Sequence, residues 1–166
     1  MFQQISAVST IRISAPKKAV LSVVQDIQSI EKFEVKADRV ELHPADSTRG
    51  TYNVVGHFAG LPWRREFAYF INEDGFYSRD ARKSGKEYTV QGGFIVQEVA
   101  PHECVLIHYE LYFVSRWFVP LRLFISTYLN WSMRRELREM RETILQSVNQ
   151  TSTAESVSPV AVIGHS

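Results

Sequence analysis

Residues 133–148 read MRRELREMRETILQSV, and this stretch decides the class of fold. Its apolar residues recur at the spacing of one helix face, at Met133, Leu137, Met140, Ile144 and Val148. Arginine and glutamate cover the other faces, and some of them stand four positions apart, the spacing of a helical ion pair. We therefore predict a long amphipathic helix from about residue 119 to residue 148, whose apolar stripe must pack on a large apolar partner.

The predicted partner is an antiparallel sheet, because the sequence before the helix follows a period of two. Turn residues separate the predicted strands, which cover residues 3–14, 40–42, 51–58, 63–71, 76–83, 88–99 and 105–114. Gly92-Gly93 indicates a bulge or a close approach of another element. Pro16 and the apolar spacing after it predict a short helix over residues 16–27, extended by a second helical piece. The fold class is therefore α+β, with a curved antiparallel sheet of about six to seven strands wrapped on the long C-terminal helix.

Length and composition predict one domain. The chain has 166 residues, of which 45% are hydrophobic, enough to build a sizeable core. We expect a ligand-binding domain over residues 1–149 and a flexible C-terminal tail over residues 150–166. The net charge of +1 offers no overall field for nucleic acid, so we expect no nucleic-acid partner. A lone Cys104, with no signal-peptide pattern and no long apolar run, predicts a cytoplasmic location.

Several segments resemble one known family. They are residues 13–16 (ISAP) leading into Val20, 23–33 (VVQDIQSIEKF), 92–94 (GGF), 105–114 and 120–121 (PL). In order and character they resemble the START-like or SRPBCC superfamily, and within it the polyketide cyclase/dehydrase branch that includes coenzyme Q-binding proteins. The resemblance spans about residues 3–148. It implies the helix-grip fold, with a cavity between sheet and helix that holds lipids, sterols, quinones, polyketides or hormones.

No catalytic residue is assigned from the sequence. The five histidines are scattered, and His57 and His108 each lie on a predicted strand, where a histidine is more often a surface or satisfied core residue than a catalyst. His102-Glu103-Cys104 lacks the second cluster that a structural zinc site needs. No nucleophile elbow, phosphate loop or dinucleotide fingerprint is present in the sequence. We therefore expect neither a metal nor a cofactor.

Arg65 is the strongest candidate for orienting a polar ligand group. It shares a predicted strand face with Trp63 and Phe67, so on a concave face the cation would need a partner such as Asp80, Glu98 or a ligand oxygen. Aromatic side chains on a sheet are more often core than ligand contacts, but this fold keeps a cavity. The candidate ligand-binding residues are Trp63, Arg65, Phe67, Tyr69, Tyr88, Phe94, Tyr109, Phe113, Phe124 and Tyr128.

The segment from Trp117 to Phe124 is too apolar for an ordinary exposed helix start. Three roles remain open for it: a lid over the cavity, a contact with another protein, or a shallow anchor in a membrane surface. The sequence assigns no oligomeric state.

The leading functional hypothesis is binding of a hydrophobic small molecule, such as a lipid, an isoprenoid quinone or a polyketide-like ring. The alternatives are a cyclase/dehydrase-type enzyme that uses the same cavity, and a protein- or membrane-docking module that uses the Trp117–Phe124 segment.

Overall fold

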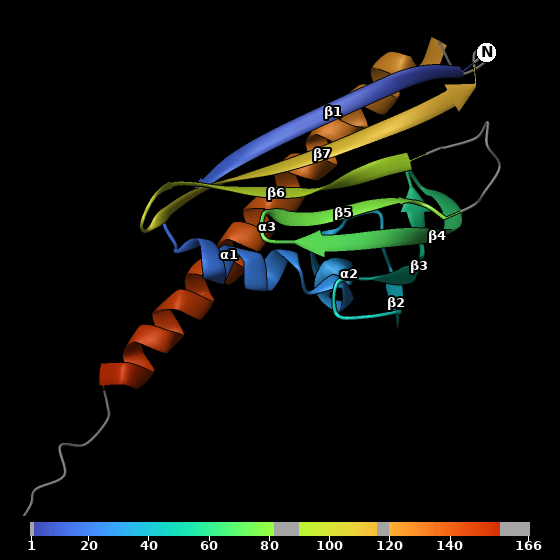
Figure 1. The fold of residues 1–166 in the computed structure, drawn as a ribbon. Coiled ribbons are helices and arrows are strands. Elements are labelled where there is room, and N and C mark those ends of the chain that lie inside the picture. The colour runs from blue at the N-terminus through green and yellow to red at the C-terminus, as the bar shows by residue number, and fades with distance from the viewer. Residues whose placement is uncertain (1, 82–89, 116–119, 157–166) are drawn as a thin grey trace, which may run out of the picture.

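The computed structural model describes residues 2–81, 90–115 and 120–156, and these form one antiparallel sheet with helices against it (Figure 1). The seven strands are Phe2–Ile13 (β1), Arg39–Pro44 (β2), Arg49–Phe58 (β3), Leu61–Asn72 (β4), Gly75–Asp80 (β5), Val90–Ala100 (β6) and Glu103–Ser115 (β7). Their order in the sheet is β1-β7-β6-β5-β4-β3-β2. Strands β2 to β7 therefore form a continuous meander, and β1 pairs with the last strand.

The helices complete the predicted α+β fold. Lys17–Val24 (α1), Ile27–Ser29 (η1) and Ile30–Phe33 (α2) follow the first strand, and Arg122–Ser156 (α3) follows the last one. Figure 1 shows α3 crossing the sheet diagonally, from the N-terminal end of β1 past α1. The predicted helix-grip architecture, with a long C-terminal helix on a curved antiparallel sheet, is confirmed.

The apolar stripe of α3 holds the helix to the sheet. Met133 and Ile144 are fully buried, and Leu137 and Met140 are nearly so. Met133 packs with Leu129 against β1, whereas the stripe beyond it joins the main core between sheet and α1. Each buried aliphatic side chain contributes about 2 kcal/mol of apolar burial, so this stripe fixes the distance between helix and sheet.

The C-terminal boundary of the helix differs from the prediction. The structure continues α3 to Ser156, so residues 150–156 of the expected tail are helical, and residues 157–166 lie outside the described part. The physical reason is that Ser, Thr and Ala cost only a few tenths of a kcal/mol per residue in a helix. No proline or glycine interrupts the chain before Pro159. The absence of apolar spacing was therefore the wrong criterion for ending the helix.

The paired glycines of β6 do not form a bulge. The pairing registers with β5 and β7 run unbroken through Gly92 and Gly93, and the irregularity lies between Glu98 and Ala100. A Cβ on Gly93 would overlap the carbonyl oxygen of Phe76. The glycine thus permits a close approach of two strands, the second of the two predicted reasons for it. The turn expected near residue 85 lies outside the described residues.

Gly56 on β3 brings the segment after α2 against the sheet. The backbone N–H of His57 donates a hydrogen bond to the carbonyl of Lys36 at 3.1 Å. A Cβ on Gly56 would overlap that carbonyl oxygen and lie 3.0 Å from Ala37 Cα. Only a residue without a side chain lets residues 36 and 37 run this close to β3.

We predict that Gly56→Ala lowers the free energy of unfolding by about 2 kcal/mol, because backbone atoms must shift to admit the methyl group. Urea unfolding followed by circular dichroism measures this. The control is Val55→Ala, an exposed neighbour on the same strand, for which we expect a loss below about 1 kcal/mol. Equal losses in the two variants would contradict the close approach.

Candidate functional site

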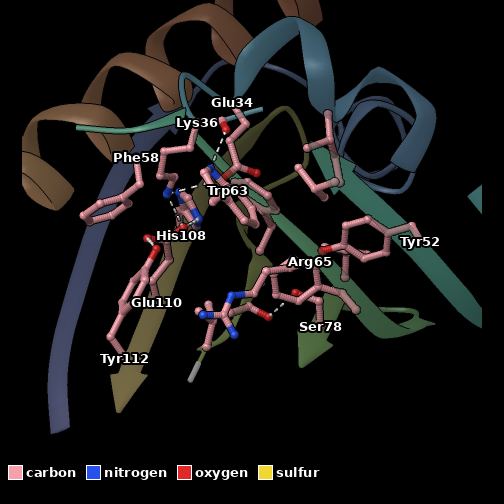
Figure 2. A pocket seen from close by; sticks show the side chains of 18 of the residues that line it. Glu34, Lys36, Tyr52, Phe58, Trp63, Arg65, Ser78, His108, Glu110 and Tyr112 are labelled. Carbon is pink, nitrogen blue, oxygen red and sulfur yellow. Dashed lines mark hydrogen bonds and ion pairs between the residues drawn. The ribbon is translucent and has the colours of Figure 1, made fainter. Parts of the chain in front are cut away.

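A half-open cavity of about 490 Å³ lies between the sheet, the segment after α2 and the first turns of α3. Figure 2 shows aromatic and charged side chains from several strands pointing into it. Its wall consists of Ile30, Glu34, Lys36, Tyr52, Val54, Phe58, Leu61, Pro62, Trp63, Arg65, Phe67, Phe76, Ser78, Val90, Gly92, Gly93, Phe94, His108, Glu110, Tyr112, Phe113 and Ile125. The volume falls in the range of small-molecule sites, roughly 300–1,000 Å³.

Half of the candidate ligand-binding residues line this cavity. They are Trp63, Arg65, Phe67, Phe94 and Phe113. The period of two in β4 places the first three on its inner face, as the sequence pattern predicts.

Four of the other candidates lie elsewhere. Tyr69 is on the inner face of β4 but beyond the cavity, packed in the core against Tyr52 and Phe76. Tyr109 points to the outer face of β7, because its neighbours His108 and Glu110 point inward. The prediction that Tyr109 lines the cavity is therefore wrong, because successive residues of a strand point to opposite faces of the sheet.

Two helical candidates also lie away from the cavity wall. Phe124 is exposed on the first turn of α3. Tyr128 packs edge-on against Phe58 of the wall, with ring centroids 4.9 Å apart, but is not itself part of the wall. Tyr88 lies outside the described residues.

Arg65 faces the cavity and is paired with Asp80. Its Nη1 donates a hydrogen bond to Asp80 Oδ2 at 2.7 Å, and the Asp80 side chain is almost fully buried. Of the partners considered from the sequence, the structure thus selects the residue on the neighbouring strand. The Arg65 side chain keeps partial exposure, so part of the guanidinium borders the cavity.

A buried charged cluster forms one end of the cavity, and its centre is Lys36. The ammonium Nζ lies 2.5 Å from Glu110 Oε1 on β7 and 3.3 Å from Glu34 Oε1, while Glu136 Oε1 on α3 stands 3.9 Å away. Tyr112 donates a hydrogen bond to the second oxygen of Glu110 at 3.0 Å. Figure 2 shows Lys36 and Glu110 close together beside His108. We call Glu34, Lys36, His108, Glu110 and Glu136 the buried cluster.

His108 adds an imidazole to the buried cluster. Its ring stacks on Phe94 with centroids 4.2 Å apart, and its Nδ1 lies 3.3 Å from Glu136 Oε2. Neither this nitrogen nor the oxygens of Glu136 meet the geometry of a hydrogen bond to another side chain, although all three atoms are buried. Such unpaired buried groups are costly and tend to occur at functional sites.

Burial sets the protonation states of this pair. It lowers the pKa of His108 to about 4, so the imidazole is neutral at neutral pH. It raises the pKa of Glu136 to about 8, so the carboxyl is mostly protonated there.

Lys36 and Glu110, beside His108 and Glu136, keep their charges. Burial opposes the charge of Lys36, but the surrounding carboxylates outweigh it and hold the pKa of the amine well above its usual value. Burial likewise opposes the charge of Glu110, and the Lys36 ammonium outweighs it, so the pKa of this carboxyl is lowered. Lys36 and Glu110 are thus an ion pair at neutral pH.

The buried cluster was missed in the sequence, although part of its signal is present. His108 and Glu110 continue the alternation of the buried Cys104 and Leu106 along β7. Glu136 stands on the apolar stripe of α3, three residues after Met133 and four before Met140. Polar residues at core positions of a regular pattern could have marked both elements. Lys36 lies in an irregular segment and carries no such signal.

The described part of the Trp117–Phe124 segment is exposed. Leu121, Leu123 and Phe124 keep 51%, 82% and 59% of their surface, and Trp117 lies outside the described residues. No helix among the described residues is long and apolar enough to cross a membrane. The docking roles of this segment, and the peripheral membrane contact, stay predictions.

Comparison with known proteins finds no matching family model and no matching curated sequence. Solved structures do match. The protein TTHA0849 from Thermus thermophilus superposes with a TM-score of 0.72 at 12% identity, covering 86% of this chain and 99% of that one. The aromatase/cyclase Zhui from Streptomyces sp. R1128 gives 0.66 at 11% identity, covering 98% and 100%. A START superfamily protein from Mycobacterium smegmatis gives 0.66 at 10% identity, covering 85% and 97%. These likenesses establish the START-like fold.

We predict that Glu136→Gln becomes increasingly stabilising, relative to the wild type, as the pH rises. The folded protein holds a proton on Glu136 up to about pH 8, whereas the unfolded chain releases it near its ordinary value of 4.5. The wild type therefore loses stability as the pH rises through this window, and the glutamine variant, which cannot titrate, does not.

Urea unfolding at about pH 5 and about pH 9 should show the difference between variant and wild type shifting in favour of the variant by about 4 kcal/mol. Glu142→Gln, an exposed carboxyl on the same helix, should show no such shift. A difference for Glu136→Gln that stays constant with pH would contradict the buried, protonated carboxyl.

Proposed function

We propose that this START-like domain binds a hydrophobic small molecule in the cavity between its sheet and α3. The observation that carries the proposal is the cavity itself: about 490 Å³ of space whose wall is mostly apolar and aromatic. A core without a ligand role closes such space, since interiors are packed as densely as organic crystals.

The wall suits a ring-bearing or aliphatic ligand. Trp63 and Phe67 lie edge to face on β4, with ring centroids 6.2 Å apart, and Phe76 and Phe94 continue the aromatic wall on the next two strands. Burying apolar ligand surface there contributes about 25 cal/mol per Å². Lipids, isoprenoid quinones and polyketide-like rings all present such surface. A START superfamily protein and an aromatase/cyclase share the fold that encloses this cavity.

We predict that the neutral dye Nile red binds with a dissociation constant of about 1 μM and gains fluorescence. Val90→Trp places an indole in the wall and should weaken binding at least about tenfold by filling the space. The control is Val99→Trp, an exposed site on the same strand, which should bind the dye like the wild type. Absence of binding at micromolar dye, or equal binding by both variants, would overturn the proposed cavity function.

Acid–base catalysis on the bound molecule is a second candidate function. The observation that favours it is the buried imidazole of His108 at the wall of the cavity, with its Nδ1 3.3 Å from a carboxyl oxygen of Glu136 and without a hydrogen-bond partner. This imidazole is neutral at neutral pH and can therefore accept a proton as a general base. In this candidate reaction His108 removes a proton next to a ligand carbonyl, and Arg65 stabilises the charge that forms on the oxygen.

Deuterium uptake next to the carbonyl of a bicyclic ketone such as tetralone tests this candidate. In heavy water the wild type should exceed the buffer rate by about a hundredfold, because the base removes a proton and returns a deuteron. His108→Phe should abolish the excess while Nile red still binds. His102→Phe, an exposed histidine, is the control. A wild-type rate equal to that of buffer would leave binding without catalysis.

A further inference from the structure

The buried cluster gives the cavity a carboxyl-rich end. Lys36 is the single ammonium among the described residues of the cluster, and three carboxyl groups surround it, those of Glu34, Glu110 and Glu136. Arg65, elsewhere in the wall, is matched by Asp80 at 2.7 Å. Because Glu136 is mostly protonated at neutral pH, the anions that can balance Lys36 are Glu110 and Glu34, and an anionic ligand group at this end would meet an ammonium that is already paired.

The ammonium of Lys36 is already occupied. Its contact with Glu110 is a short ion pair, and Glu34 lies within ion-pair distance on another side. A ligand carboxylate could reach this ammonium only by displacing a protein carboxylate, which would then be left buried without its partner. The cluster thus offers acceptors to a ligand more readily than it offers donors.

Glu34 is the member of the cluster best placed to meet a ligand. Its side chain keeps 26% exposure and lines the cavity, whereas those of Lys36 and Glu136 keep only 2% and 1%. Burial raises its pKa, and a second cation nearby would favour its charged form.

A second observation at the same end, independent of the charges, is a buried side chain without a hydrogen-bond partner. His108 is 4% exposed and lines the cavity, and its Nδ1 has no hydrogen-bond partner. Its Nε2 lies 3.7 Å from Glu110 Oε1, too far for a hydrogen bond. The imidazole is therefore held beside the carboxyl groups without a full set of partners of its own.

Aromatic rings stand next to the carboxyl-rich end. The indole N–H of Trp63 donates a hydrogen bond to the carbonyl of Lys36 at 3.0 Å, which places the ring beside the cluster. Phe58 and Tyr112 pack against each other in the wall, with ring centroids 6.1 Å apart and the rings tilted by 49°. Ring faces attract cations, and more strongly where water is excluded. Carboxyl groups and aromatic rings together form a suitable environment for an ammonium group.

We propose that the preferred ligand is a lipophilic amine, with its ammonium group at the carboxyl-rich end beside Glu34 and its apolar body along the aromatic wall. This inference rests on the proposed function, since it specifies the ligand of the same cavity. It predicts an order of affinity for three ligands that share one apolar chain and differ in the head group. The ligand with an ammonium binds more tightly than the one with a hydroxyl, which binds more tightly than the one with a carboxylate.

Isothermal titration calorimetry with dodecylamine, dodecanol and dodecanoate at neutral pH tests this ranking. The shared chain keeps the apolar contribution constant, so the difference reports the head group. We expect the amine to bind at least about tenfold more tightly than the carboxylate, the scale of one charge-assisted hydrogen bond. If the carboxylate or the alcohol binds as tightly as the amine, the inference is wrong, while the proposed function stands. If neither these ligands nor Nile red binds, the proposed function itself fails.

Two variants test whether the ligand ammonium binds beside Glu34. Glu34→Gln should weaken dodecylamine about tenfold and leave dodecanol within about twofold of the wild type, which also shows that the variant is folded. Glu66→Gln, an exposed carboxyl on the other face of β4, should bind all three ligands like the wild type. Amine binding that survives Glu34→Gln unchanged would overturn the assigned site.

Discussion

The ion pair between Lys36 and Glu110 organises the inside of this protein. A buried ammonium must be paired, and the nearest oxygen of Glu110 lies 2.5 Å from it. The pair joins the irregular segment after α2 to β7, and Glu136 adds α3 to the same cluster. The backbone of Lys36 takes part as well, because its carbonyl accepts hydrogen bonds from His57 and from the Trp63 indole. One residue thus links β3, β4, β7 and α3 at the end of the cavity.

This link sets the carboxyl-rich end of the cavity apart from an ordinary core. Burying charged side chains is costly unless they are paired, so this end is held by ion pairs rather than by apolar packing. Buried ion pairs also contribute little to the free energy of unfolding, and replacing such a pair by apolar residues of similar size often leaves a protein equally or more stable. The buried cluster is therefore better explained by recognition of a ligand than by stability. In the function proposed above, the apolar walls supply affinity and the cluster selects among ligand head groups.

The fold was predictable because its signals are regular. The stripe from Met133 to Val148 and the period of two through β2 to β7 each repeat over many residues, so single exceptions do not hide them. The face of β4 that carries Trp63 and Arg65 followed from the same period. Tyr109 shows the limit of this reasoning, since aromatic character suggested an inward position while the strand register turns it outward. The helix end near Ser156 was missed because no residue there stops a helix.

The charged end of the cavity was harder to find for a different reason. It is assembled from the segment after α2, from β7 and from α3. Lys36 precedes Glu110 by 74 positions and Glu136 by about a hundred, so no local sequence pattern connects these residues. His108, Glu110 and Glu136 could have been recognised as polar residues at core positions. Lys36 could not, because its burial depends on Gly56 of β3 allowing a close approach of the two backbones.

The most direct test of the account is a crystal structure of the protein purified from its native host, with the space between sheet and α3 examined for extra density. A ligand-binding cavity predicts an elongated or ring-shaped molecule along Trp63 and Phe67, with its polar end against Glu34. Side chains closing that space, or ordered water alone within it, would contradict a ligand-binding cavity.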